Sequence, residues 1–125
     1  MDPFQRGRSW AGKFRDAWIG LGQGVQGQTS FYVHLPMAVA VVLLGFWLQV
    51  SITEFSILLL CIAMVLALEL VNSSLEAMSR AITDQYNESL GKALHIASAA
   101  VLLASLFSAV VGLLILGPKL IEWTG

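Results

Sequence analysis

Residues 55–76 read FSILLLCIAMVLALELVNSSLE, an apolar run that passes into polar residues at its end. The apolar part, residues 55–71, approaches the length that a helix needs to cross a bilayer, which is about 20 residues. Residues 35–50 and 93–116 are two further apolar runs, and residues 31–33 extend the first of them outward. The sequence therefore predicts an all-α membrane protein with three transmembrane helices, the first two joined by a turn at residues 51–54.

The composition agrees with a membrane protein. Of the 125 residues, 57% are apolar and 12% are charged, whereas soluble domains carry about 25% charged residues. So short a chain buries little surface of its own, so we expect it to associate with further copies of itself. The net charge of −1, with no cluster of basic and aromatic residues, excludes nucleic acid as a partner.

Basic residues in the connecting segments predict the orientation, because Lys and Arg resist translocation. The segment before the first span and the one between the second and third contain Arg6, Arg8, Lys13, Arg15, Arg80 and Lys92. The segment between the first two spans has no basic residue, and the tail has only Lys119. The N-terminus and the second loop are therefore predicted to face the cytoplasm, in a multi-pass topology.

The chain divides into an N-terminal interfacial amphipathic segment, residues 1–30, and a three-helix transmembrane domain, residues 31–125. One face of the predicted N-terminal helix is apolar and consists of Trp10, Phe14, Ala17, Trp18, Leu21 and Val25. Two tryptophans beside basic residues are typical of a surface helix in the headgroup layer. The alternative is a helix that caps the bundle by packing on protein, and both can hold.

A stripe of small side chains recurs along the third span at steps of three and four residues. Its members are Ala93, Ala97, Ala100, Ala104, Ser108 and Gly112. Small residues allow helix backbones to approach closely in lipid, where the hydrophobic effect contributes little to association. The stripe predicts a contact between helices.

Polar residues at the end of the second span share one helix face. At about 100° per residue, Asn72 lies roughly 60° and Glu76 roughly 20° from the direction of Glu69. Glu69 still belongs to the apolar run, and an ionisable residue at that depth normally faces a bundle interior or a polar cavity. The face indicates a functional site, although polar residues in bundles also serve only to hydrogen-bond a neighbouring helix.

Two carboxylates on one face suit a division of labour in phosphoryl transfer. One can accept a proton from a hydroxyl while the other helps to hold a divalent cation. Mg²⁺ prefers hard oxygen ligands and usually binds through one or two carboxylates together with substrate phosphates. The enzyme in such a reaction mainly positions its substrates and offsets charge. His34, at the mouth of the first span, is more typical of a hydrogen bond than of a ligand.

Several segments resemble the small bacterial diacylglycerol kinase and undecaprenol kinase family. The most specific are ELVNSSLEA at 69–77, DQYNE at 84–88 and ASAAVLL at 97–103; KFRDAWIGL at 13–21, FYVH at 31–34 and SITEF at 51–55 add to them. The resemblance implies a homotrimer in the bacterial inner (plasma) membrane, with active sites shared between protomers near the cytoplasmic interface. It also implies MgATP as donor and a membrane lipid alcohol as acceptor.

The resemblance also assigns roles by position. Glu69 is expected to be the general base on the lipid hydroxyl, Glu76 a metal ligand beside the ATP phosphates, and Asn72 the residue that orients both. Tyr86 and Glu88 are expected along the nucleotide. Trp47 and Ser98 are expected to line the lipid side, together with Glu69.

Four positions depart from the family pattern. Gln28 stands where a second metal-binding glutamate is usual, and it can still coordinate Mg²⁺ through its carbonyl. Arg80 replaces an acidic residue and can pair with Glu76 or contact a phosphate of ATP. Leu94 and His95 replace a Lys-Asp pair, and His95 can supply a charge to the nucleotide when it is protonated.

The leading hypothesis is an ATP-dependent lipid kinase. Because of the four departures, the second hypothesis is a catalytically inactive homologue that acts as a membrane scaffold. A small transporter comes third. The sequence does not choose between diacylglycerol and undecaprenol, since both present a hydroxyl at the same depth.

Overall fold

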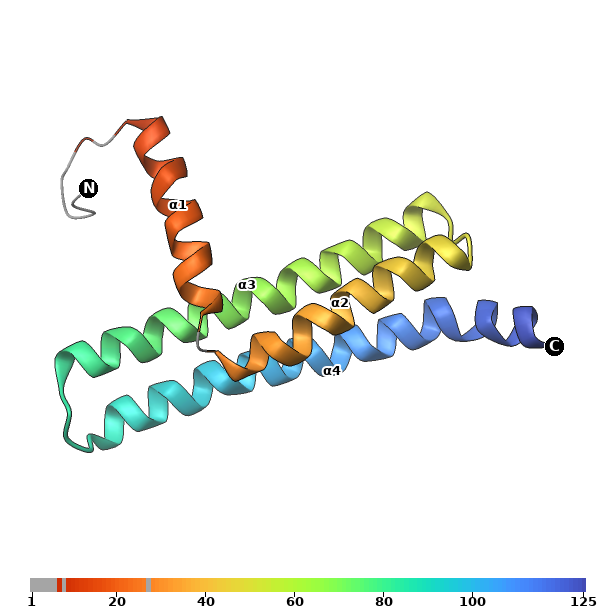
Figure 1. The fold of residues 1–125 in the computed structure, drawn as a ribbon. Coiled ribbons are helices and arrows are strands. Elements are labelled where there is room, and N and C mark those ends of the chain that lie inside the picture. The colour runs from red at the N-terminus through yellow and green to blue at the C-terminus, as the bar shows by residue number, and fades with distance from the viewer. Residues whose placement is uncertain (1–6, 8, 27) are drawn as a thin grey trace.

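The computed structural model describes residues 7, 9–26 and 28–125. These residues form four α-helices and contain no strand: α1 (Trp10–Val25), α2 (Thr29–Trp47), α3 (Ile52–Ile82) and α4 (Glu88–Thr124). Helices α2, α3 and α4 lie side by side in an elongated bundle, and α1 projects from it at a steep angle (Figure 1). The predicted all-α class is correct. Arg6 and Arg8 lie outside the described residues.

Three of the helices, α2, α3 and α4, are long and apolar enough to cross a membrane, which confirms the three predicted spans. Helices α3 and α4 contain 31 and 37 residues. At 1.5 Å per residue they are about 46 and 55 Å long, whereas a hydrocarbon core is about 30 Å thick. Helix α3 therefore continues beyond the apolar run at residues 55–71, and helix α4 continues beyond the one at residues 93–116.

Helix α2 begins earlier than the apolar run, at Thr29. An apolar run beginning at residue 35 would put Pro36 in the opening turn of the helix, but Pro36 lies inside it. A proline at this position removes the hydrogen bond that its N–H would donate to the carbonyl of Tyr32. Residues 29–33 extend the helix because nothing in that segment breaks its backbone ladder.

The connection between α2 and α3 is a tight turn at residues 48–51, rather than at 51–54 as the sequence suggested. Ser51 is the N-cap of α3: its Oγ accepts from the Glu54 N–H at 3.1 Å, and its own N–H donates to Glu54 Oε1 at 3.0 Å. This reciprocal capping box satisfies two backbone donors and moves Glu54 into the helix. Lys119 of α4 lies 3.7 Å from the same carboxylate.

Aromatic contacts hold this end of the bundle together. Phe46 and Phe55 face each other across the turn, with ring centroids 4.9 Å apart. Trp47, at the end of α2, meets Trp123 of α4 edge-on at 4.8 Å. Gly45 is buried beneath Phe55, where a Cβ would come within 3.1 Å of the Phe55 ring. The three helices are therefore tied together at the end where the first two are joined.

The small-residue stripe of α4 is only partly covered within one protomer. Ala104 is buried, and Ala97, Ser108 and Gly112 are half-buried, whereas Ala93 and Ala100 are exposed. Helix α4 packs mainly against α3. The stripe thus forms the predicted helix contact at its centre and leaves other members available to a second chain.

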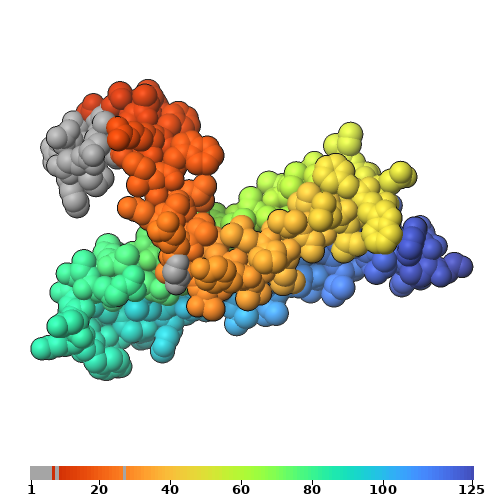
Figure 2. All heavy atoms as spheres, in the orientation of Figure 1, coloured from red at the N-terminus to blue at the C-terminus, as the bar shows by residue number. Residues whose placement is uncertain are grey.

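Helix α1 touches the bundle near its own C-terminal end. A Cβ at Gly24 would collide with the side chain of Leu70 on α3, so the two helices approach closely there. The larger apolar residues Trp10, Phe14 and Trp18 are exposed, and α1 stands clear of the bundle in the space-filling view (Figure 2). Among the described residues of one chain, none covers the large apolar side chains of this face, and the interfacial position stays a prediction.

Candidate functional site

Glu69 is buried at the contact between α2 and α3. Only 3% of the residue is exposed, although it carries a carboxylate. Its Oε1 lies 3.0 Å from Nδ1 of His34 on α2. This contact has the distance of an ion pair, but the ring and the carboxylate are not aligned as in a hydrogen bond. The second span thus buries the Glu69 carboxylate beside the His34 imidazole.

Asn72 and Glu76 lie on the same face of α3, as the spacing predicted. Asn72 Nδ2 donates to Glu76 Oε1 at 3.1 Å. Asn72 Oδ1 is buried and accepts no hydrogen bond from the described residues. Buried polar atoms are normally satisfied, so an orphaned carbonyl oxygen beside a carboxylate indicates a missing ligand. An oxygen donor set of this kind fits a hard cation.

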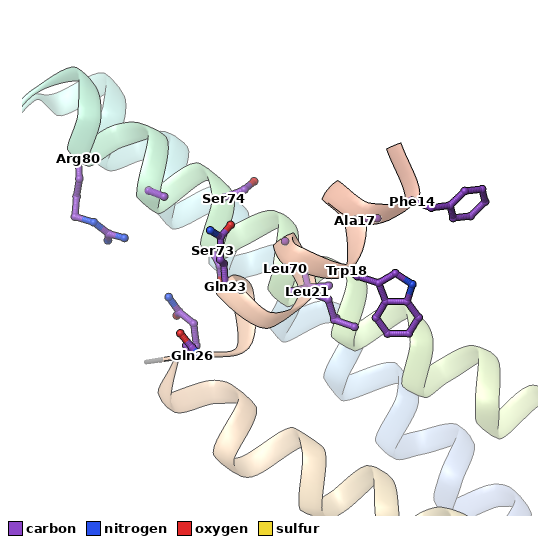
Figure 3. Close-up of a pocket in the computed structure, with 14 residues that line it drawn as sticks. Phe14, Ala17, Trp18, Leu21, Gln23, Gln26, Leu70, Ser73, Ser74 and Arg80 are labelled. Carbon is purple, nitrogen blue, oxygen red and sulfur yellow. The ribbon is translucent and has the colours of Figure 1, made fainter. Parts of the chain in front are cut away.

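A groove of about 860 Å³ opens between α1 and α3. Its described lining includes Gln28 at the start of α2 and Arg80 near the end of α3. Figure 3 shows Arg80 and Gln26 toward one end of the groove, and Phe14 and Trp18 toward the other. The groove is therefore polar at one end and apolar at the other. Glu69, Asn72 and Glu76 do not line it.

The remaining predicted nucleotide residues lie on the outside of the protomer. Tyr86 is 89% exposed in the connection between α3 and α4, and Glu88, which begins α4, is exposed as well. Along α4, His95 and Ser98 are also exposed. No described contact joins these four side chains to Glu69. Within a single chain they do not form one enclosed site with it.

Trp47 lies far from the predicted base. Since His34 contacts Glu69 and Trp47 follows 13 residues later on the same helix, about 20 Å separates them along the axis. Trp47 packs on Trp123 instead. This contact lies at the opposite end of the bundle from Glu69, and the predicted lipid contact of Trp47 stays a prediction.

The donor set for a divalent cation is small. The described residues contain no group of three or more His, Cys, Asp or Glu side chains that could hold a metal. Glu76 and the free Asn72 Oδ1 offer two adjacent oxygen ligands. That number fits Mg²⁺, which usually keeps its remaining positions for water and substrate phosphates. Gln28 lines the groove, whereas Glu76 does not.

Sequence reasoning missed His34 as a neighbour of Glu69. The signal was present in the register of the helical hairpin. Counting back from the turn, His34 lies 16 residues before Val50, and Glu69 lies 18 residues after Ser51. Two antiparallel helices joined by a short turn place such positions within one helical turn of each other.

Comparisons with known proteins agree with these features. A family model described as "Prokaryotic diacylglycerol kinase" matches residues 15–116. The chain belongs to the prokaryotic diacylglycerol kinase family. As a member it is a lipid kinase, and its three apolar spans make it a membrane protein. The matched region contains Glu69, Asn72 and Glu76, together with His34.

Individual members of the family cover most of the chain at similar identity. It is 32% identical over 117 residues to "Undecaprenol kinase" from Bacillus subtilis (strain 168), covering 90% of this chain and 95% of that protein. It is 32% identical over 98 residues to "Diacylglycerol kinase" from Escherichia coli (strain K12), covering 78% and 74%. A "Diacylglycerol kinase" from Synechocystis sp. is 32% identical over 110 residues, which is 87% of this chain and 63% of that protein. Relatives with two different substrate names are thus equally similar in identity.

Proposed function

We propose that this protein transfers the γ-phosphoryl group of ATP to the hydroxyl of a membrane lipid, either diacylglycerol or undecaprenol. The observation that carries the proposal is the buried carboxylate of Glu69 inside an apolar span, with the Asn72–Glu76 pair one to two turns further along the same face. A charge at that depth is costly and is typical of a functional site.

Glu69 is the proposed general base. It accepts the hydroxyl proton as the lipid oxygen bonds to the γ-phosphorus, and the bond from that phosphorus to the bridging oxygen of ATP breaks, so ADP leaves. General-base catalysis of this kind typically contributes about 10² to 10⁴ in rate. The remaining task of the protein is to position the two substrates and to offset the charge on the transferred group.

Glu76 and Asn72 are the proposed Mg²⁺ ligands. The unpaired Asn72 Oδ1 and the Glu76 carboxylate provide hard oxygens on one face, and Gln28 is a further proposed carbonyl ligand. When bound by these residues, Mg²⁺ would offset negative charge on the phosphates of ATP. Arg80, exposed and near the end of α3, supplies a second cation toward the phosphates. Tyr86, Glu88 and His95 complete the proposed nucleotide site.

The acceptor is proposed to approach from the lipid side, near Glu69 and Ser98. The groove between α1 and α3 does not include Glu69 or Ser98 in its described lining, but its passage from Arg80 and Gln26 to Phe14 and Trp18 suits an amphiphile beside the site. Both acceptor lipids present a hydroxyl above a long apolar part. Trp47 stays a proposed lipid contact through its exposed face.

A homotrimer in the bacterial inner (plasma) membrane, with the N-terminus in the cytoplasm, completes the proposal. Tyr86, Glu88, His95 and Ser98 have no described contact with Glu69 in their own chain, so a shared site would take them from a neighbouring copy. The exposed apolar side chains of α4 supply a surface for that association. They are Leu102, Leu103, Leu106, Phe107, Val110, Leu113 and Leu114.

A phosphorylation assay tests the function. Purified protein in mixed detergent–lipid micelles receives labelled MgATP with either diacylglycerol or undecaprenol, and a control omits the lipid. We expect label in at least one lipid. Sedimentation and thermal unfolding establish that the protein is a folded trimer. No transfer to either lipid by a folded trimer would contradict the proposal and favour the scaffold hypothesis.

A further inference from the structure

The pair formed by Glu69 and His34 is asymmetric in its access to solvent. The Glu69 side chain is 4% exposed, whereas that of His34 is 23% exposed. Phe31 and Val65, each one turn away on the same helices, are buried as well. Glu69 is thus enclosed by apolar neighbours and meets the exterior through the imidazole.

A buried base that takes up a proton must also lose it before the next turnover. Transfer of a phosphoryl group from ATP to an alcohol releases one proton from the hydroxyl. An enclosed carboxylate exchanges protons poorly with water, because water has to reach it first. His34 Nδ1 lies 3.0 Å from Glu69 Oε1 and makes no hydrogen bond with any described residue, so it is available to receive that proton.

We propose that His34 relays this proton from Glu69 to the exterior; the inference rests on the proposed function. The lipid O–H bond breaks and its proton passes to the Glu69 carboxylate. Glu69 then gives the proton to His34 Nδ1, and the pair is for a moment a carboxylate–imidazolium ion pair. The ring then turns about its Cβ–Cγ bond so that Nδ1 releases this proton to the exterior. It returns as the Nε2–H tautomer, with Glu69 charged for the next cycle.

The other ionisable residues on the neighbouring helices do not offer this proton a second path out of Glu69. Helix α2 has no Asp, Glu, Lys or Arg, and its Tyr32 is exposed. On α3 the next carboxylate, Glu76, lies two turns away and accepts from Asn72, and Arg80 is exposed. On α4, Lys92 and His95 are exposed. No described residue other than His34 makes a polar contact with the Glu69 carboxylate, whether hydrogen bond or ion pair.

The test separates a relay from a static clamp by three variants in the lipid kinase assay. His34→Ala removes the ring, and kcat is expected to fall about 100-fold while the KM for ATP stays unchanged. Imidazole added to the buffer is expected to restore part of that kcat. His34→Asn keeps an N–H donor near the Nδ1 position but accepts no proton, so its kcat is expected to stay as low as that of His34→Ala.

The control is Glu69→Gln, which imidazole is expected to leave unchanged. The double variant Glu69→Gln/His34→Ala is expected to be no slower than Glu69→Gln alone, because both residues act in one step. If His34→Ala lowers the unfolding temperature, His34→Gln, which is closer to His in volume, replaces it in the kcat and KM comparison.

Near-normal kcat in His34→Asn would overturn the relay, since a hydrogen bond would then suffice. Failure of imidazole to raise the kcat of His34→Ala would do the same. A wild-type protein that phosphorylates no lipid would instead overturn the proposed function, and this inference with it. An active wild type with an active His34→Asn overturns the relay alone.

Discussion

Polar side chains are paired at the N-terminal end of α3 and left without good partners toward its other end. At the N-terminal end, Ser51 and Glu54 satisfy each other through a capping box, and Lys119 lies beside the same carboxylate. Toward the other end, Asn72 Oδ1 is buried without a partner among the described residues, and Glu69 is buried against a single misaligned imidazole. Satisfied polar groups stabilise a fold, whereas unsatisfied ones cost free energy.

The difference indicates which end of α3 contributes to stability and which end contributes to function. The N-terminal end closes a hairpin and joins three helices through aromatic contacts. The segment from Glu69 to Asn72 keeps a carboxylate and an unpaired oxygen buried, where both are unfavourable. We therefore expect substitutions at the first end to change stability with activity retained, and substitutions at the second end to change activity with stability retained.

The largest effect is expected for Glu69→Gln. The substitution keeps size and hydrogen bonding but removes the base, so kcat is expected to fall by about 10² to 10⁴. Glu54→Gln is the matched control, because it changes a glutamate on the same helix and glutamine also serves in a capping box. Lipid phosphorylation under saturating MgATP measures both. Near-normal turnover of Glu69→Gln would remove Glu69 as the base.

Arg80→Ala is expected to raise the KM for ATP by roughly 10-fold to 100-fold, because a hydrogen bond to a charged group contributes about 1.5–3 kcal/mol. Lys119→Ala, at the opposite end of the bundle, serves as the control and is expected to leave that KM unchanged. ATP titrations at fixed lipid give the values. A gain of activity in Arg80→Ala would mean that Arg80 blocks Glu76, and would support the scaffold hypothesis.

Gly45→Ala tests the aromatic end of the comparison. The added Cβ would lie 3.1 Å from the Phe55 ring, which is itself packed on Phe46. Overpacking of this kind costs about 1 to 3 kcal/mol, so the midpoint of thermal unfolding is expected to fall. Gly22→Ala, where a Cβ meets no atom within 4 Å, is the control. Lost activity in Gly45→Ala that remains folded would break the division between the two ends.

The smallest effect is expected for Ser51→Ala. Losing the N-cap costs about 1 kcal/mol, which should lower the unfolding midpoint slightly and leave kcat per folded molecule unchanged. The control is Ser56→Ala, since the Ser56 hydroxyl only donates to the Ile52 carbonyl four residues back. An equal shift in both variants would show that the capping box contributes nothing.

The sequence predicted what depends on one helix and missed what depends on two. The shared face of Asn72 and Glu76 follows from helical geometry alone, and the Asn72–Glu76 hydrogen bond confirms it. The apolar runs predicted three spans but not helix ends such as Ile82, because caps and backbone ladders extend helices past their apolar residues. The contact between His34 and Glu69 needed the register of the α2–α3 hairpin.

The groove could not be read from the sequence at all. Its shape depends on the angle at which α1 leaves the bundle, and the close approach of the two helices is between Gly24 and Leu70, 46 positions apart in the chain. A contact so distant leaves no periodicity in either segment. A shared Mg²⁺ site for Gln28 and Glu76 would likewise depend on how separate helices pack.

The length of α3 has a consequence for where two immiscible substrates can meet. Glu69 lies 17 residues after Ile52, about 26 Å, which is close to the thickness of a hydrocarbon core, and about 20 Å of helix remain beyond it. With the Ser51 end at one membrane surface, Glu69 lies at the opposite phase boundary and Arg80 stands in water. In the proposed reaction ATP therefore stays in water and the lipid stays in the membrane. The transferred phosphoryl group passes from the aqueous substrate to the membrane-bound one.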